Sequence, residues 1–387
     1  MARLEPAQAI GGLVMPGPCV RSRLVKAQPR RVADRSVADL MGTVRAKDRK
    51  LSTKTAVEVM ANAMSMGGRG VYAGRMHAIV VGAGVSGLTT ASALVEDGWS
   101  VDIVARHRHP DTVSVVAAAI WTTTNAEPQV LVRQWALATR ERFATIAADP
   151  TSGIVPLMQR EFERLDPGPL WWESTPYVRR LEDHELPAEY AAGFEVDGFI
   201  IEPPTYLDWL TNRLIEHGVT VATNEVAALE DLEADVIVNC TGLGARDLVG
   251  DGAMFPIRGQ VVAVANPGIS DGVSDESDAD RVAYVYPRSR EVILGGARQI
   301  GNEETSPDDD LTERILSDAA RLDPLVAGTE VLDVRVGLRP GRPEVRVEAG
   351  VLGDGRTVVH NYGHSGAGFL LSWGCALDVV ALANAAI

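Results

Sequence analysis

The stretch Met76-His-Ala-Ile-Val-Val-Gly82-Ala-Gly84-Val-Ser-Gly87 decides the fold. Its apolar run Ala78–Val81 is typical of a buried strand. A helix is predicted over Leu88–Glu96 with its end at Gly98, and Val101–Val104 predicts a second strand. A strand, a helix and a strand in this order form a βαβ unit, whose crossover is expected to be right-handed.

The glycines of this unit have the spacing of a dinucleotide-binding turn. Gly82 is expected to make the tight turn, Gly84 to let the backbone approach a pyrophosphate, and Gly87 to allow close packing of helix on strand. The helix N-terminus adds N–H groups and the positive end of the helix dipole. A purely structural turn is the alternative. We predict that FAD or NAD contacts Gly82, Ala83, Gly84, Val85, Ser86 and Gly87.

Arg106 stands where an acidic residue usually ends the second strand and binds the ribose hydroxyls of the cofactor. Asp102 lies within the strand and Asp111 in the following loop. Taken alone, Arg106 favours a 2′-phosphate and hence NADP. It is therefore a candidate cofactor-binding residue, and an NADP-dependent dehydrogenase is one alternative function.

The composition is that of an acidic chain. Its 387 residues have a formal net charge of −15, so neither nucleic acid nor an anionic membrane is an expected partner. No apolar run is expected to approach the roughly 18 residues of a membrane span. Cys19, Cys240 and Cys375 are far apart and lack metal-ligand spacing, so we expect a cytoplasmic protein without a bound metal.

Residues 1–75 differ from the rest of the chain in charge. They hold 14 Lys and Arg against 5 Asp and Glu, and they lack a clear strand pattern. We expect a disordered or non-native leader that precedes the true start at Met76. An Arg-rich transit peptide is the alternative.

Further apolar patterns predict the remaining elements. Helices are expected at Tyr206–Glu216, Leu311–Leu322 and from about Gly368 to the C-terminus. Strands are expected at residues 219–222, 236–239, 292–294, 331–336 and 345–347, the last two separated by a Pro-rich turn, and within an antiparallel region over 261–286. The acidic stretch Ser270–Asp280 is expected to be a mobile loop.

The strand Val236–Asn239 ends in the small-residue turn Cys240-Thr241-Gly242. Such a turn lets the backbone come close to a ligand. The segment resembles the second dinucleotide contact of flavoprotein oxidases, which implies cofactor contacts at Thr241 and Gly242. A plain strand that ends in a glycine turn explains the segment nearly as well.

The segment Val358-Val-His-Asn-Tyr-Gly363-His-Ser-Gly366-Ala-Gly368-Phe-Leu-Leu-Ser-Trp-Gly-Cys-Ala376 matches the signature of the FAD-dependent D-amino-acid oxidase and D-aspartate oxidase family. A glycine-rich loop that leads into a helix presents backbone donors to a flavin. The resemblance implies FAD contacts at Gly363, Gly366, Ala367, Gly368, Phe369 and Leu370. His360 and His364 lack further ligands, so we expect structural or hydrogen-bonding roles for them.

Two segments resemble the substrate-binding parts of this family. Arg339, in Gly337-Leu-Arg339-Pro, occupies the place of the arginine that clamps the substrate carboxylate. Tyr284, in Tyr284-Val-Tyr286-Pro, resembles the tyrosine that touches the same carboxylate, and Tyr286 would line the side-chain pocket. The resemblance makes Arg339 and Tyr284 the catalytic candidates. The lid tyrosine of mammalian members is replaced by Asp280.

Arg298 is the residue that could decide between acidic and neutral substrate side chains. The D-aspartate oxidases resemble this chain here, with an arginine that reads a second carboxylate, whereas Arg298 could instead pair with Glu303 or Glu304. The other family arginine has no counterpart except Arg281. Acidic and neutral D-amino acids therefore remain equally open, and Arg298 is a candidate substrate contact.

Smaller matches complete the resemblance, which covers about Met76 to Ile387. Val115–Trp121 resembles the segment that passes the flavin, which implies cofactor contacts at Ala118 and Ala119 and a substrate contact at Ile120. Thr112 and Ser114 resemble the family's hydroxyl cluster near the cofactor. Ser365 and Gly366 are further substrate candidates. Arg342 is expected to pair with Glu344 or Glu348 if it does not bind substrate.

The resemblance implies an α/β fold in which a Rossmann-like FAD-binding domain is interleaved with a mixed, largely antiparallel β-sheet substrate domain. The FAD-binding domain is expected to comprise residues 76–119, 203–255 and 335–387, and the substrate domain residues 120–202 and 256–334.

The implied reaction is oxidative deamination of a D-amino acid by hydride transfer to flavin N5. The products are a 2-oxo acid, ammonia and hydrogen peroxide. The small-molecule substrate and oxygen are the expected partners, with a homodimer as an option. A glycine- or sarcosine-type amine oxidase and a non-catalytic flavin protein remain as alternatives.

Overall fold

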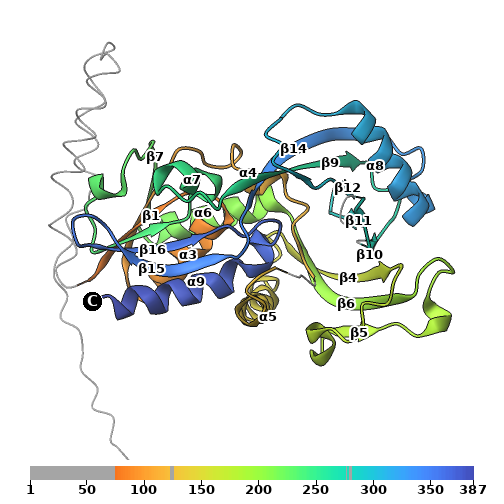
Figure 1. The fold of residues 1–387 in the computed structure, drawn as a ribbon, viewed down its shortest axis with the longest axis horizontal. Helices are drawn as coiled ribbons and strands as arrows, with labels where there is room; N and C mark the ends of the chain where they lie inside the picture. The colour runs from red at the N-terminus through yellow and green to blue at the C-terminus, as the bar shows by residue number, and fades with distance from the viewer. Residues whose placement is uncertain (1–74, 123–125, 276, 279–280) are drawn as a thin grey trace, which may run out of the picture. The chain divides into compact units, whose positions relative to one another are not determined.

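The computed structural model describes residues 75–122, 126–275, 277–278 and 281–387. The predicted leader (except Arg75), Cys19 and Asp280 lie outside the described residues. Two β-sheets with their covering helices make up the described chain (Figure 1).

The predicted βαβ unit lies in the middle of a six-stranded sheet, sheet A. β1 (His77–Val81) pairs in parallel with β2 (Ser100–Ala105) on one side and with β8 (Val236–Asn239) on the other. Four of the five β1 residues are buried, which explains its apolar sequence. The order is β15-β16-β8-β1-β2-β7, and only β15 is antiparallel to its neighbour. The outer strands are β7 (Thr220–Thr223), β16 (Thr357–Tyr362) and β15 (Arg346–Val351).

Long helices cover sheet A. α3 (Val85–Glu96) and α9 (Gly368–Ala385) pack side by side, α3 against β1 and β2 and α9 against β15 and β16 (Figure 1). α5 (Gln129–Ile146) packs on α9, and α6 (Pro203–Glu216) packs on α3. The four predicted helices are therefore present, since α8 (Asp309–Leu322) is the fourth, whereas α5 was not predicted.

α9 is the core helix of this half of the structure. By length and composition it could cross a membrane, so the expectation that no apolar segment approaches this limit was wrong. In the structure 61% of this segment is buried. Gly374 brings it close to α5: the Gly374 N–H donates to Thr139 Oγ1 (3.0 Å), and a methyl group at Gly374 would collide with the Trp135 backbone.

Sheet B has ten strands and is largely antiparallel, as predicted. Its order is β13-β9-β12-β11-β10-β4-β6-β3, with β14 paired to β9 and β5 to β6. The pair β10–β4 is the parallel exception. The strands are β3 (Ile120–Trp121), β4 (Ile154–Glu163), β5 (Val178–Arg180), β6 (Ala192–Ile201), β9 (Phe255–Val264), β10 (Gly272–Asp275), β11 (Ala283–Pro287), β12 (Val292–Gly295), β13 (Gln299–Ile300) and β14 (Val331–Gly341).

The two faces of sheet B have different partners. α8 packs against β9, β11 and β12 through an apolar cluster that includes Leu294, Leu311 and Ile315 (Figure 1). The other face carries a second cluster with Tyr284 and Tyr286, which Ala118 and Ile120 join from the segment before and within β3. We call this second side the tyrosine face.

Short helical turns connect these elements. They are α4 (Val113–Val116), α7 (Ala245–Leu248), η1 (Trp171–Ser174), η2 (Asp183–Glu185), η3 (Leu229–Asp231), η4 (Gly242–Gly244) and η5 (Pro324–Val326). α4 and η4 both contact β14, which brings segments of the FAD-binding part to the edge of sheet B.

Three details differ from expectation. The acidic stretch 270–280 was predicted to be a loop, but it contains β10, whose Ser274 and Asp275 are buried between β4 and β11. β14 continues to Gly341 and includes part of the predicted Pro-rich turn. It also places residues 335–341 in sheet B, although they were assigned to the FAD-binding domain. The division into two domains otherwise stays a prediction.

We expect Gly374→Ala to destabilise the protein, although alanine favours a helix by about 1 kcal/mol over glycine. The added methyl must push α5 away from α9, and such overpacking costs about 1–3 kcal/mol. Thermal unfolding followed by circular dichroism should therefore show a lower Tm. Gly252→Ala is the control, because a methyl there meets nothing within 4 Å. Equal Tm values for both variants would contradict the close helix packing.

Candidate active site

The turn between β1 and α3 leaves no room for side chains at two of its glycines. Gly82 has φ +118° and its N–H donates to the Val104 carbonyl (2.8 Å). A methyl at Gly82 would collide with the Cys240 carbonyl oxygen, and a methyl at Gly87 with the carbonyl oxygen of Gly82 itself. α3 therefore starts directly against the ends of β1 and β8, and its first-turn N–H groups have no partners within the helix.

Ser114, one of the two residues of the predicted hydroxyl cluster, lies at the start of α3. Ser114 Oγ accepts the Val85 N–H at 3.0 Å. Thr112 Oγ1 is buried and has no hydrogen-bond partner among the described residues. A buried hydroxyl without a partner is costly, so this atom is available to a polar ligand.

The glycine-rich loop after β16 meets the same helix end. Gly363 (φ +81°) and Ser365 (φ +52°) turn the chain. Gly368 then begins α9 next to Val85, since a methyl group at Gly368 would lie 3.6 Å from the Val85 side chain. The N-termini of α3 and α9 therefore adjoin. Two positive helix ends repel each other, and a bound anion between them relieves that repulsion. The predicted loop contacts Ala367, Phe369 and Leu370 lie in this first turn.

His364 is buried within the loop. Its Nδ1 lies 3.4 Å from Ser86 Oγ, whereas its Nε2 has no partner among the described residues. Burial lowers the pKa of His364 to about 4, so the imidazole is neutral at pH 7. A hydrogen-bonding role fits this geometry. In the part of the chain that the structure describes, no cluster of three or more His, Cys, Asp or Glu could hold a metal ion.

Thr241 and Gly242 form the third part of the cofactor side. Asn239 Oδ1 accepts the Thr241 N–H (3.1 Å) and the Thr241 hydroxyl (2.7 Å), and Gly242 has φ +58°. Cys240 packs beneath the turn of β1, and burial raises the pKa of its thiol to about 12. The thiol therefore acts as a small apolar group.

Arg106 follows the last residue of β2 and lies at the surface. Its Nη1 lies 3.4 Å from Glu225 Oε1, and the side chain is 61% exposed. The neighbouring carboxylate competes with a 2′-phosphate, which weakens the argument for NADP. Its predicted cofactor contact stays a prediction.

Arg339 lies where the cofactor loop and sheet B meet. Its guanidinium stacks over Gly259, where a side chain would collide with it, and its Nη1 donates to the Ala297 carbonyl at 2.8 Å. Gly366 of the loop lies beside its Cδ, and the Ser365 N–H donates to the Pro340 carbonyl at 2.9 Å. No described carboxylate pairs with Arg339, so the guanidinium can bind one from a ligand.

Tyr284 and Tyr286 lie stacked on the tyrosine face, with ring centroids 4.6 Å apart and 10° between their planes. The Tyr284 ring occupies the space above Gly295 and Gly296, where side chains would collide with it or crowd it. Ala297, which follows directly, accepts the hydrogen bond from Arg339. The two predicted catalytic residues are therefore brought to one short segment.

Ile120 and its neighbours reach the tyrosines from the other side. Ala119 has φ +52°, and its carbonyl accepts the Ile201 N–H (2.8 Å). Arg288, which the sequence analysis missed, donates from Nη2 to the carbonyls of Ala117 (2.7 Å) and Ala118 (2.8 Å). Arg288 is buried, which lowers its pKa, while Glu291 opposes this shift. The sequence gives little sign of this role, because Arg288 looks like any other arginine in a turn.

Two further arginines from the sequence analysis, Arg281 and Arg342, have partners within the protein. Arg281 pairs through two hydrogen bonds with Asp318 of α8 (3.0 and 2.7 Å), so a carboxylate of the protein compensates its charge. Arg342 pairs with Asp251 (3.1 Å) and the Glu344 carbonyl (2.8 Å), not with the carboxylates predicted for it.

Arg298 forms neither of the two ion pairs, with Glu303 or Glu304, that were given as the alternative to substrate binding. Glu303 binds Arg246 at 2.8 Å, and Glu304 accepts the N–H groups of Thr305 and Ser306. Arg298 itself is exposed, and no described residue forms an ion pair with it. The alternative that Arg298 pairs with Glu303 or Glu304 was therefore wrong.

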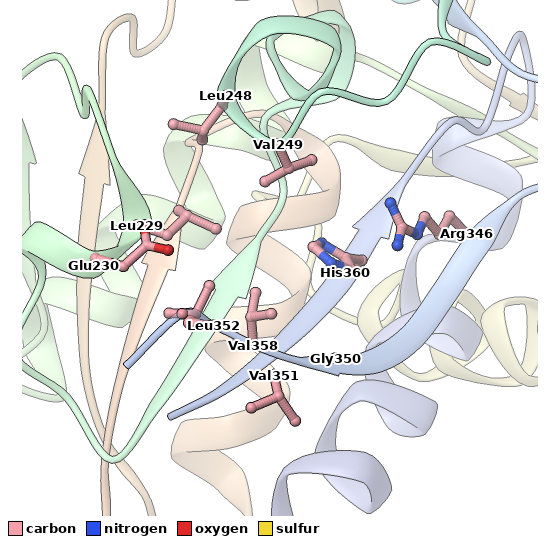
Figure 2. A pocket seen from close by; sticks show the side chains of 11 residues that line it. Leu229, Glu230, Leu248, Val249, Arg346, Gly350, Val351, Leu352, Val358 and His360 are labelled. Carbon is pink, nitrogen blue, oxygen red and sulfur yellow. The ribbon is translucent and has the colours of Figure 1, made fainter. Parts of the chain in front are cut away.

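A cavity of about 340 Å³ lies elsewhere, on the side of sheet A formed by β15 and β16 (Figure 2). Leu248, Val249 and Val358 point into it, with His360 and Arg346 along one side (Figure 2). Burial lowers the pKa of His360 to about 4. Because none of the predicted substrate residues lines this cavity, it is not the candidate active site.

Comparisons with known proteins identify the family of this chain. The family model described as FAD dependent oxidoreductase matches residues 77–382. D-amino-acid oxidase from Rubrobacter xylanophilus is 44% identical over 319 residues, which cover 80% of this chain and 97% of that protein. Human D-aspartate oxidase is 35% identical, with 79% and 94% covered. Glycine oxidase from Geobacillus kaustophilus shares the fold, with a TM-score of 0.67, 19% identity, and coverage of 81% and 95%.

The fold and the two glycine-rich turns thus define an FAD-dependent oxidoreductase. More specifically, the chain belongs to the D-amino-acid oxidase family. FAD is the cofactor of this family, and the residues present fit it. The turn after β1 has room only for glycine at Gly82 and Gly87, and two buried polar atoms of neighbouring segments, Thr112 Oγ1 and His364 Nε2, have no hydrogen-bond partner among the described residues.

We expect Thr112→Val to weaken FAD binding. If the buried hydroxyl bonds the cofactor, its loss costs one hydrogen bond to a charged group and raises the FAD Kd about 10-fold or more. Fluorescence titration of deflavinated protein measures this Kd. Thr145→Val on the exposed side of α5 is the control. The same Kd in wild type and Thr112→Val would show that the hydroxyl does not face FAD.

His364 should make stability depend on pH. Because its folded pKa of about 4 lies below its usual 6.5, the unfolded chain binds more protons between these values. The contribution of neutral His364 is complete above pH 6.5 and is lost as the pH falls towards 4. The Tm difference between pH 7 and pH 4.5 should therefore be smaller in His364→Asn than in wild type or in the exposed control His184→Asn. Identical differences in all three proteins would contradict this assignment.

Proposed function

We propose that this chain is an FAD-dependent D-amino-acid oxidase, which converts a D-amino acid to a 2-oxo acid, ammonia and hydrogen peroxide. The observation that carries the proposal is the position of Arg339. Its guanidinium lies against Gly366 of the FAD loop on one side and bonds Ala297, next to the Tyr284 ring, on the other. A carboxylate bound there lies between the cofactor loop and the tyrosine face.

Arg339 binds and orients the substrate. Nη1 is held by the Ala297 carbonyl, and no described residue accepts from Nε or Nη2. This edge of the guanidinium can take a carboxylate through two parallel hydrogen bonds. The bond to Ala297 fixes the plane of the fork before substrate arrives, which lowers the entropy lost on binding.

The tyrosine face provides the second contact and excludes water. Tyr284 is 6% exposed, and its ring is held between Tyr286 and the two glycines of β12 and its end. A rigid, buried surround strengthens the hydrogen bonds that its hydroxyl makes with a carboxylate. FAD would be held by the turn after β1 and the loop before α9, and would supply the acceptor for the hydride from the substrate Cα and the route for its two electrons to oxygen.

Orientation is the main contribution of this chain to rate. Fixing the carboxylate at two points sets the direction of the Cα–H bond, and such positioning can supply several kcal/mol of the barrier reduction. The buried His364 is neutral at pH 7 and lies in the cofactor loop. It therefore adds no charge to the cofactor loop.

D-amino acids with acidic side chains are the less favoured class of substrate. Their one candidate cation is Arg298, which is exposed. Water screens an exposed charge, so the pair it could form with a second carboxylate contributes little. We therefore propose D-amino acids without a side-chain carboxylate as the preferred substrates. Peroxide formed faster from D-aspartate than from D-alanine would overturn this preference.

Arg339→Ala should lower kcat/KM for D-amino acids by about 1,000-fold or more, because it removes a bidentate charge-assisted contact to the carboxylate. A peroxide-coupled assay measures this, and the visible spectrum shows whether FAD is retained. Arg290→Ala is the control, since this arginine is exposed in the turn between β11 and β12. A yellow Arg339→Ala protein with normal kcat/KM would overturn the assignment.

A further inference from the structure

The cavity beside β15 and β16 lies in an apolar cluster on one face of sheet A. Leu229 of η3 and Val249 after α7 line it from the connections that cover this face, and Val358 lines it from β16 (Figure 2). Gly350 of β15, which lies opposite Val358 in the ladder, offers no side chain to fill it. Its volume of about 340 Å³ is near the lower end of the range for small-molecule pockets, about 300–1,000 Å³.

The charged side chains at this cavity do not favour an ionic ligand. Arg346 and Glu230 stand on opposite sides of it (Figure 2). Arg346 donates to Glu348 at 2.6 Å and lies 3.3 Å from Asp251, so carboxylates of the protein compensate its charge. Glu230 is exposed, and water screens its charge. An uncharged molecule, in contrast, gains by burying its apolar surface against the walls.

His360 presents a hydrogen-bond donor to the cavity. It is 5% exposed, and burial lowers its pKa to about 4, so at pH 7 the imidazole is neutral and carries one N–H. Its Nδ1 lies 3.5 Å from Asn239 Nδ2. Asn239 Oδ1 accepts the N–H and the hydroxyl of Thr241, which fixes the amide with Nδ2 towards the imidazole. Since Nδ2 only donates, Nδ1 accepts and the proton is on Nε2.

The Nε2–H group of His360 has no acceptor among the described residues. It lies on the side of Gly350, because a methyl group at Gly350 would be 3.6 Å from Nε2. Gly350 and His360 both line the cavity. A buried donor without an acceptor destabilises the folded protein, so an acceptor placed in the cavity beside Gly350 is favourable.

We propose that this cavity binds a small uncharged carbonyl compound with a compact apolar body, and that its occupation tightens the binding of FAD. The carbonyl oxygen accepts the Nε2–H of His360, and the apolar body fills the space beside Gly350 and Val358. None of the residues assigned to substrate or FAD lines this cavity, so it is a second site on the same chain. The inference does not depend on which substrate the enzyme oxidises.

Asn239 connects this cavity to the cofactor side. Its Nδ2 faces His360, and its Oδ1 holds Thr241, the predicted FAD contact after β8. The 3.5 Å contact between Asn239 and His360 is long for a hydrogen bond and can shorten. An acceptor on Nε2–H makes Nδ1 a better acceptor, because hydrogen bonds in a chain polarise one another. The amide and the Thr241 turn are then held more firmly before FAD arrives, so the two ligands favour each other.

The test uses cyclohexanone as the probe, since it is uncharged and compact and carries one carbonyl acceptor. NMR of the FAD-loaded protein with ¹⁵N-labelled histidines reports which ring nitrogen of each imidazole carries the proton. His360 should show a proton on Nε2, and cyclohexanone should shift that signal saturably, with a Kd of roughly 1 mM. His360→Phe identifies the signal by its disappearance.

Gly350→Ala is the variant that fills the site. Its methyl group would make ordinary contacts with Val358 at 3.4 Å and with His360 Nε2 at 3.6 Å, so the fold accommodates it while the space in front of the N–H is lost. We expect the cyclohexanone shift to disappear. Gly252→Ala is the matched control, because a methyl there meets nothing within 4 Å and Gly252 does not line the cavity.

FAD titration of the deflavinated protein measures the link to the cofactor. Saturating cyclohexanone should lower the FAD Kd about 5-fold in wild type and in Gly252→Ala, and should leave it unchanged in Gly350→Ala. Neither measurement uses turnover, so a failure of the proposed oxidase activity is recorded separately by the peroxide assay.

Three results would overturn the proposal. A His360 signal that does not respond to cyclohexanone means that water alone meets this donor, and removes the site. A shift that persists in Gly350→Ala means that the probe binds elsewhere. A shift with an unchanged FAD Kd removes the link to the Thr241 turn. A shift and a lower FAD Kd that both vanish in Gly350→Ala support the site and its link to the cofactor.

Discussion

The hydrogen bond from the Ser365 N–H to the Pro340 carbonyl joins the two halves of the site. Pro340 follows Arg339 at the end of β14, and Ser365 precedes Gly366 in the loop that starts α9. The two glycines beside Arg339, Gly259 and Gly366, leave it room to lie flat between sheet B and the loop. Arg339 therefore cannot shift without shifting the glycine-rich loop, which keeps the guanidinium at a fixed distance from that loop.

A second connection fixes the segment ahead of β3. Arg288, buried at the end of β11, donates to the carbonyls of Ala117 and Ala118 ahead of β3. Glu291 compensates its charge and is itself bound by Arg335 of β14 at 2.7 Å. One network of ion pairs and hydrogen bonds thus joins β14, the β11–β12 turn and the segment ahead of β3. A buried charge network of this kind fixes one arrangement of the segments it joins, at the cost of desolvation.

Much of the fold and site could be predicted because the information is local. The β1–α3 turn, the loop before α9 and the Arg339 segment are each contiguous, and each carries its chemistry within about ten residues. The parts that were missed depend on pairing between distant strands. β10 reads as an acidic loop, and it is a strand only because β4 and β11 bury Ser274 between them. The mixed polarity of β4, likewise, hides which of its polar residues face the tyrosines.

The chain carries a formal charge of −15, yet its candidate site is organised around cations and positive helix ends. These positive groups lie where the phosphates and the substrate carboxylate are expected. The net charge of the whole chain therefore does not set the charge of the ligand, because a bound ligand responds mainly to the few charged groups close to it.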